Sequence, residues 1–330
     1  MMDFLILVTP DGHLDESKVV KTEEISKQKN VDRLSLTRFW IDSEQGLRSY
    51  IFKPSKDRKP IQFELWLQSV VLPRLENVPS PKLLASRIDE EANVFWMIFE
   101  DMGRIEPVFN HEVRVKAANK MASWHSLPLD TIQKQQQSFM PLIDETMQDL
   151  LNDWATYAGL LQNTGIAVEQ TELFFRKLME VNGSFPDEQV VCHGDYHCLN
   201  LLERVDDLIV LDWEFIQINS IYWDFYTLFD MATPRYEIRI NKETRLDALH
   251  QYIDQRTQLG WNAPPDFVYN YHLYSLIYSA WILRLLENDL KADRFDRDAL
   301  LRQRREMTEI IGDCFDMILP VISHPSHQIR

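Results

Sequence analysis

The chain has little of what several protein classes require. Its 330 residues include three cysteines, Cys192, Cys198 and Cys314, which are too few for a disulfide framework and indicate a reducing, cytoplasmic setting. Nine glycines argue against an architecture built from many tight glycine turns. Lysine and arginine number 35 against 51 aspartates and glutamates. The formal net charge of −16 argues against a nucleic-acid partner and gives no support for binding at an anionic membrane.

Long uncharged apolar runs are also missing. The longest apolar stretch, residues 271–288, contains His272 and Arg284, so we expect a buried helix there and not a membrane span. The first residues have no basic flank before their short apolar run, so no signal peptide is expected. Apolar residues make up 45% of the chain, which at this length suffices for two packed lobes.

The spacing of the apolar residues changes after residue 102. Before it, short runs of β-branched and aromatic residues predict strands at residues 34–42, 47–54 and 93–102. Apolar residues at helical spacing predict a helix at residues 61–75, between the second and third strands. After it, helical spacing dominates residues 111–127, 141–181 and 221–320. Residues 189–194 and 208–213 predict two short strands that form one small pair. We therefore predict a β-rich lobe over 1–102, with residues 1–30 unplaced, and a helical lobe over 103–330.

The densest group of chemically capable side chains is "VVCHGDYHCLNLLERVDDLIVLDWEF", residues 190–215. A zinc site is disfavoured because Cys192, His193, His197 and Cys198 fall within seven residues and no second cluster follows. A nucleophile site is disfavoured because the stretch has no G-x-S-x-G motif and its adjacent Cys–His pairs face different ways in an extended chain. A polar hairpin with capping aspartates remains an alternative.

Phosphoryl transfer fits this stretch better. That reaction needs a carboxylate to orient the acceptor hydroxyl, oxygen ligands for Mg²⁺ and a cation on the phosphates. Asp195 follows one strand, Asn200 comes five residues later, and Asp212 ends the next apolar run. Asn200 and Asp212 offer the hard oxygen ligands that suit Mg²⁺, which leaves Asp195 to accept the hydrogen bond of a hydroxyl.

"CHGDYHCLNLL" followed by "IVLDWEFIQINSIYWDF" resembles the aminoglycoside phosphotransferase and choline kinase superfamily of small-molecule kinases. Further matching segments are "SYIFK", "FELWLQSVVLPRLENVPSPKLL", "WMIFEDMG" and "ANKMASWHSL". The order and spacing agree from about residue 35 to 230. The resemblance implies an α+β, protein-kinase-like two-lobed fold with a small β-rich N-lobe and a larger, mainly helical C-lobe. It also implies ATP and Mg²⁺ as cofactors and a small-molecule hydroxyl acceptor.

The resemblance assigns roles to individual residues. Asp195 is expected as the catalytic carboxylate, Asn200 and Asp212 as Mg²⁺ ligands, and Lys53 as the contact to the α- and β-phosphates, paired with Glu64. Three neighbouring residues are expected in supporting roles. His193 is expected to pack under the loop, and Asp224 is expected to anchor the loop backbone. Glu214 is expected near metal-bound water or a cationic acceptor. For His197 three roles stay open: a place near the acceptor, orientation of Asp195, or a purely structural part.

The nucleotide-binding segments follow the family pattern less closely. The main chain from Glu100 to Met102 is expected to contact adenine. The phosphate-covering loop is expected around Ser43 and Gly46, but it has one glycine where related folds use several. Its acidic neighbours Asp42 and Glu44 repel phosphate if they point inward.

Three functions compete at this stage. The first is an active kinase whose acceptor lies between residues 141–181 and 265–290 and is cationic if Glu214, Asp224, Trp281 and Glu287 line it. The second is a catalytically weak or inactive kinase-like protein with a structural or regulatory role, which the poor phosphate loop favours. The third, a protein kinase, fits less well because "WEFIQINSIYWDF" leaves little room for an activation segment.

Overall fold

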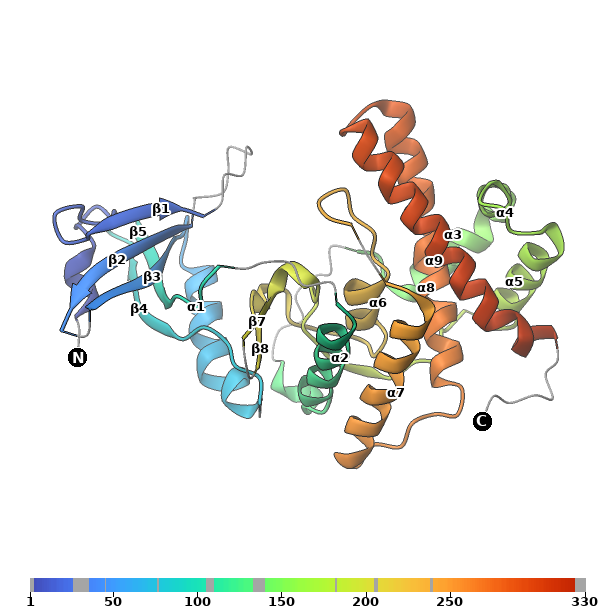
Figure 1. The fold of residues 1–330 in the computed structure, drawn as a ribbon, viewed down its shortest axis with the longest axis horizontal. Coiled ribbons are helices and arrows are strands. Elements are labelled where there is room, and N and C mark those ends of the chain that lie inside the picture. The colour runs from blue at the N-terminus through green and yellow to red at the C-terminus, as the bar shows by residue number, and fades with distance from the viewer. Residues whose placement is uncertain are drawn as a thin grey trace. The chain divides into compact units, whose positions relative to one another are not determined.

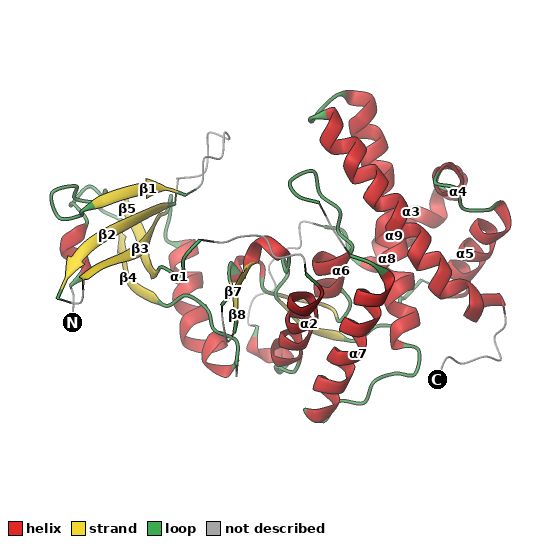
Figure 2. Cartoon of the chain, viewed as in Figure 1, coloured by secondary structure: helices red, strands yellow, loops and turns green. Residues whose placement is uncertain are grey.

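The computed structural model describes residues 3–25, 36–44, 46–75, 77–104, 110–132, 140–181, 183–204, 207–237 and 240–323. The chain forms two compact units. The first unit comprises Met1–Glu106 and Leu201–Glu214, and the second comprises Pro107–Asn200 and Phe215–Arg330. Strands dominate the first unit and helices the second, which confirms the predicted α+β class (Figure 2).

A five-stranded antiparallel sheet forms the first unit, in the order β1–β2–β3–β5–β4 (Figure 1). The strands are β1 Lys21–Glu24, β2 Thr37–Ser43, β3 Gly46–Pro54, β4 Leu83–Asp89 and β5 Val94–Glu100. The predicted hairpin and the strand after the helix are thus confirmed. The sequence did not reveal β1, because "KTEE" is fully polar. The charges of β1 suit an edge strand, since they discourage further strand pairing.

One hydrophobic cluster of the first unit lies on one face of this sheet. Its centre consists of Phe39, Ile41, Phe52, Trp96 and Ile98, all of which are buried. Helix α1 (Lys59–Trp66) continues as a π-helical turn (Leu67–Val71) and a 3₁₀ turn (Leu72–Arg74), which together match the predicted helix. The same unit contains the antiparallel hairpin β7 (Leu201–Glu203) and β8 (Leu208–Val210). Val210 N–H donates to the Pro79 carbonyl at 3.0 Å, which fixes the hairpin to the chain after α1.

Helices build the second unit. They are α2 His111–His125, α3 Ile143–Asn152, α4 Trp154–Asn163, α5 Val168–Glu180, α6 Trp223–Phe229, α7 Lys242–Gln258, α8 Phe267–Ala292 and α9 Arg297–Ser323. The long helices α8 and α9 pack side by side (Figure 1). Residues 271–280 of α8 are buried throughout, as the apolar run predicted. Within the described ranges, no helix combines the length and the apolar character that a membrane crossing needs.

The predicted pairing of the two short strands is wrong. Strand β6 (Gln189–Cys192) pairs antiparallel with β9 (Gln217–Ser220), whereas β8 pairs with β7. The reason is chain distance, because β7 and β8 are separated by four residues and their hairpin closes at a low entropic cost. The loop that carries Asp195 therefore leaves β6 without turning back into a hairpin.

A buried ionic network holds α6, α7 and α8 together. Asp230, which follows α6, accepts hydrogen bonds from Arg245 Nη2 at 2.8 Å, from Tyr271 at 2.5 Å and from Ser275 at 2.7 Å. The side chains of Asp230 and Arg245 are both fully buried. Arg245 also reaches Asp313 of α9 at 3.1 Å. Since every partner is hydrogen-bonded, removal of one leaves buried charge without compensation.

We expect Asp230→Ala to lower the free energy of unfolding by about 3–5 kcal/mol, the usual cost of breaking a buried ion pair. Urea denaturation followed by circular dichroism measures the change. Asp316→Ala is the matched control, because Asp316 is 70% exposed and meets Lys242 only at 3.8 Å. Equal effects of the two substitutions would contradict the structural importance of the network.

Candidate active site

The loop of residues 193–200 is anchored by one buried carboxylate. Asp224 of α6 accepts the main-chain N–H groups of His193 at 2.8 Å and Gly194 at 3.0 Å. Its Oδ2 also accepts Trp124 Nε1 at 2.8 Å and lies 3.2 Å from His125 Nε2. Burial alone raises the pKa of Asp224, but the hydrogen bond from His125 and its companions hold that pKa below the ordinary value. Asp224 is therefore an ionised anchor, as the sequence predicted.

The rest of the loop is held as tightly. Trp223 Nε1 donates to the Gly194 carbonyl at 2.8 Å, and Thr227 Oγ1 donates to the Tyr196 carbonyl at 3.0 Å. The hydroxyl of Tyr196 donates to the carbonyl of Ala117 in α2 at 3.0 Å. The sequence reasoning missed these three donors, because aromatic and threonine side chains on a helix look like ordinary core. Together they fix the backbone on both sides of Asp195.

Gly194 is required at its position for two reasons. Its φ of +90° lies in the left-handed region that L side chains rarely adopt. A Cβ at this position would lie 2.1 Å from the carbonyl oxygen of Phe215, which is a backbone atom that cannot move aside. The close approach of the two backbones therefore depends on glycine.

The loop brings Asp195, His197 and Asn200 together. Asn200 Nδ2 donates to the Asp195 carbonyl at 2.8 Å and lies 3.5 Å from Asp195 Oδ2. His197 Nε2 lies 3.4 Å from Asp195 Oδ1. Burial raises the pKa of Asp195, but the hydrogen bond from His197, the electrostatic interactions with His197 and His193, and the hydrogen bond from Asn200 together leave that pKa below its ordinary value. The carboxylate of Asp195 is thus ionised and its side chain is 24% exposed. The amide nitrogen of Asn200 is hydrogen-bonded, and the amide oxygen is the atom suited to bind a cation.

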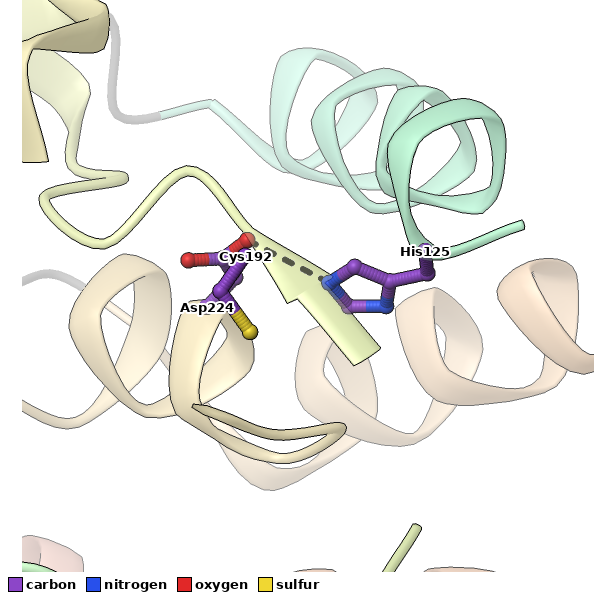
Figure 3. A group of neighbouring side chains, drawn as sticks. All are labelled: His125, Cys192 and Asp224. Atoms are coloured by element: carbon purple, nitrogen blue, oxygen red, sulfur yellow. Dashed lines mark hydrogen bonds and ion pairs between the residues drawn. The ribbon is translucent and has the colours of Figure 1, made fainter. Parts of the chain in front are cut away.

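A second cluster in this unit resembles a metal site by distance only. In the part of the chain that the structure describes, His125, Cys192 and Asp224 are buried and each has a possible ligand atom within 4.8 Å of those of the other two (Figure 3). Their atoms are already used, because Asp224 has the four donors above and His125 Nδ1 bonds the Tyr252 hydroxyl at 2.8 Å. Burial also raises the pKa of Cys192 well above its ordinary value, which disfavours a thiolate ligand. We interpret the cluster as the structural base of the loop.

In the first unit, four charged side chains gather at the ends of β3, α1 and β8. Lys53 Nζ lies 3.8 Å from Glu214 Oε2, and each side chain is about one-third exposed. Burial raises the pKa of Glu64, the charges of Asp212 and Glu214 raise it further, and Lys53 acts in the opposite direction. Lys53, Glu64 and Asp212 are thus neighbours, while the ion pair that the structure gives Lys53 is with Glu214. The predicted Lys53–Glu64 pairing stays a prediction.

The backbone at Asp212 has an unusual conformation. Its φ of +60° lies in the left-handed region, which non-glycine residues seldom occupy. Such conformations cost free energy and occur preferentially at functional sites. The strain at a residue that the sequence had already singled out is consistent with a role for its carboxylate.

The segment expected to contact adenine is braced by two arginines that the sequence reasoning missed. Arg38 of β2 donates to Asp101 at 2.7 Å and to the Gly103 carbonyl at 2.8 Å. Arg204 donates to the Met102 carbonyl at 2.9 Å. The N–H of Glu100 donates to the Lys82 carbonyl at 2.9 Å. A nucleobase is therefore expected to meet the other main-chain groups of this segment.

The candidate phosphate loop is the turn between β2 and β3. Ser43 and Gly46 face each other in the register, and the Ser43 hydroxyl donates to the Gly46 carbonyl at 2.7 Å. Gly46 has a φ of +94°, which the turn requires. The hydroxyl of Ser43 thus stabilises the turn, and phosphate contact by the turn stays a prediction.

We expect Gly194→Ala to unfold or rearrange the loop of residues 193–200, because the new Cβ overlaps a backbone oxygen. Gly165→Ala is the matched control, since Gly165 has a φ of +96° and nothing lies within 4 Å of its Cβ position. The control should lose about 1–2 kcal/mol from backbone strain alone. Thermal denaturation should show a clearly larger loss for Gly194→Ala, and equal losses would contradict the close approach to Phe215.

Comparisons with known proteins agree with this fold. A choline kinase from Cryptosporidium parvum Iowa II has a similar structure, with a TM-score of 0.57, 15% identity, and coverage of 97% of this chain and 95% of that one. An aminoglycoside phosphotransferase from Alicyclobacillus acidocaldarius matches with a TM-score of 0.57, 11% identity, and coverage of 91% and 93%. At such identities the likeness shows the fold, which confirms the predicted protein-kinase-like class.

The amicoumacin kinase hAmiN, solved with AMP-PNP and Ca²⁺, is similar at a TM-score of 0.55 and 13% identity, and the match covers 93% of this chain and 91% of that one. Among curated protein sequences, none matches this chain significantly. The model of the phosphotransferase enzyme family, APH, matches residues 30–261, which is well over half of the chain. The chain therefore belongs to the phosphotransferase enzyme family.

Proposed function

We propose that the protein transfers the γ-phosphoryl group of ATP to a hydroxyl of a small molecule, with Mg²⁺ as cofactor. The acceptor oxygen forms a bond to the γ-phosphorus while the bond from that phosphorus to the β–γ bridging oxygen breaks. ADP leaves, and the hydroxyl proton passes to Asp195. In this proposal the N-terminal lobe binds the nucleotide and the helical lobe binds the acceptor, with the division near residue 102. The cytoplasm is the proposed location, since the three cysteines are free.

The observation that carries the proposal is the fixed pair of Asp195 and Asn200. Asp195 is partly exposed, and the backbone groups of its neighbours His193, Gly194 and Tyr196 are hydrogen-bonded to buried side chains. Its lowered pKa keeps the carboxylate ionised at neutral pH, so it can accept a hydrogen bond from a hydroxyl. Positioning and electrostatic stabilisation supply most of the rate in such reactions, and a rigid loop serves both.

The donor set suits Mg²⁺. Asn200 Oδ1 and the Asp212 carboxylate are hard oxygen ligands, and the amide nitrogen of Asn200 is committed to the Asp195 carbonyl. Bound Mg²⁺ neutralises phosphate charge, and the role of the two residues is to hold it.

Lys53 is the proposed cation for the α- and β-phosphates. In the structure its ammonium group lies beside the carboxylate of Glu214. When the nucleotide binds, phosphate oxygens take the place of that carboxylate beside Lys53. Adenine presents a hydrogen-bond donor and an acceptor side by side on one edge. The carbonyl of Glu100 can accept from that donor, and the N–H of Met102 can donate to that acceptor. The Met102 carbonyl accepts Arg204, which makes it less available to the N–H donors of guanine and favours ATP.

The evidence for a cationic acceptor weakens in the structure. Asp224 is fully buried under four donors, and Glu287 forms a 2.6 Å ion pair with Arg304. Neither carboxylate is therefore placed to attract a cation. We therefore define the acceptor only as a small molecule that carries a hydroxyl group, such as an aminoglycoside, a sugar or an amino alcohol.

Two substitutions separate nucleotide binding from chemistry. We expect Mg²⁺–ATP to raise the melting temperature of the parent protein by mass action. Asp212→Asn should abolish the Mg²⁺-dependent part of that shift, because a metal ligand is lost. Asp195→Asn should keep the shift but lower turnover about 100-fold or more, the usual contribution of acid–base catalysis. Thermal shift and ADP release with a panel of hydroxyl acceptors measure the two effects.

Glu90→Gln is the control, since it also removes one negative charge from the first unit, at an exposed ion pair with Arg58. It should leave both readouts unchanged. If the parent protein shows no shift at millimolar Mg²⁺–ATP, the alternative of a weak or inactive kinase-like protein is favoured. If Asp212→Asn binds Mg²⁺–ATP as well as the parent, the assignment of the metal ligand is wrong.

A further inference from the structure

His197 is held in the loop of residues 193–200 by a backbone hydrogen bond, by the contact of its ring nitrogen with Asp195 and by the neighbouring ring of Tyr236. Its carbonyl accepts the N–H of Asn200 at 2.9 Å, which closes the 3₁₀ turn Cys198–Asn200. Its side chain is only 17% exposed, and Nε2 lies 3.4 Å from Asp195 Oδ1. The ring is therefore a partly buried neighbour of the carboxylate.

The other ring nitrogen identifies the tautomer. His197 Nδ1 is buried and has no hydrogen-bond partner within the described part of the chain. A buried N–H without an acceptor is costlier and rarer than a buried acceptor without a donor. The proton therefore belongs on Nε2, where it faces the carboxylate, and Nδ1 carries the lone pair.

The ring of Tyr236 backs the imidazole. The two ring centroids are 5.7 Å apart, with an angle of 52° between the planes. The segment 232–236 is in turn held by α9, since Gln303 Nε2 donates to the Ala232 carbonyl at 2.9 Å and Arg302 Nη2 donates to the Pro234 carbonyl at 2.8 Å. The ring of Tyr236, which packs against the imidazole, therefore belongs to a segment that is hydrogen-bonded to α9.

We propose that His197 is a positioning residue, whose Nε2–H donates to Oδ1 of Asp195 and fixes the rotation of that carboxylate. Of the three roles that the sequence left open, the geometry selects orientation of Asp195. The inference rests on the proposed function, in which Asp195 receives the hydroxyl proton of the acceptor. A carboxylate that can rotate spends less time in the productive geometry, and a misplacement of about 1 Å can cost about 100-fold in rate.

Amide substitutions test the position of the donor. In glutamine, the Nε2 amide is three bonds from Cβ, as is Nε2 of histidine, whereas the amide nitrogen of asparagine is two bonds away, as is Nδ1. We therefore expect His197→Gln to keep kcat within about threefold of the parent. His197→Asn and His197→Leu should each lower kcat by about 10- to 100-fold, with KM for ATP and the melting temperature nearly unchanged.

Two outcomes would overturn the proposal. Equal kcat values for the asparagine and glutamine variants would show that the donor position does not matter. A rise in KM for the acceptor at constant kcat would make His197 an acceptor-binding residue.

A second readout does not depend on kinase activity. Ring ¹⁵N chemical shifts of the full chain, assigned by comparison with His197→Gln, report the tautomer of His197. We expect the Nε2–H form in the parent protein and a shift toward the Nδ1–H form in Asp195→Asn, whose amide can donate to Nε2. An Nδ1–H form in the parent overturns the proposal. An Nε2–H form in a protein that phosphorylates no acceptor overturns the proposed function and leaves the positioning contact established.

Discussion

The hydrogen bonds to the carboxylate of Asp224 are the interaction on which the candidate site depends. One side chain accepts two successive main-chain N–H groups of the loop and two aromatic side chains of α2. The anchor is buried, so its loss leaves four donors without an acceptor and a loop without a fixed shape. The chemistry that we propose needs a rigid loop more than it needs an unusual side chain, because phosphoryl transfer relies on position and charge.

Electrostatics distinguishes the two groups of site residues. Asp195 has hydrogen-bond donors around it and a lowered pKa, which suits a carboxylate that stays ionised beside a hydroxyl. In the first unit, Glu64 lies near Lys53, Asp212 and Glu214, and its pKa is raised by burial and by the charges of the two neighbouring carboxylates. Such crowding of carboxylates favours a cation beside them, which fits a metal-dependent nucleotide site.

Local signals in the sequence predicted much of this architecture. The hairpin and the helices follow from periodicity, and the loop of residues 193–200 follows from motif spacing, because both signals depend on near neighbours in the chain. The pairing of β6 with β9, the edge strand β1 and the braces from Arg38 and Arg204 could not be predicted, because they depend on contacts between distant segments. The motif predicted a catalytic role for Asp195, whereas the contact of His197 with Asp195 could be seen only in the structure.

A crystal structure with Mn²⁺ and a non-hydrolysable ATP analogue tests the central claim most directly. The anomalous signal of the metal should lie about 2.1 Å from Asn200 Oδ1 and from the Asp212 carboxylate, with Lys53 on the phosphates. Asp195 should face the γ-phosphate across the space for a hydroxyl. A metal held by other residues, or an Asp195 that points away from the phosphates, would contradict the account.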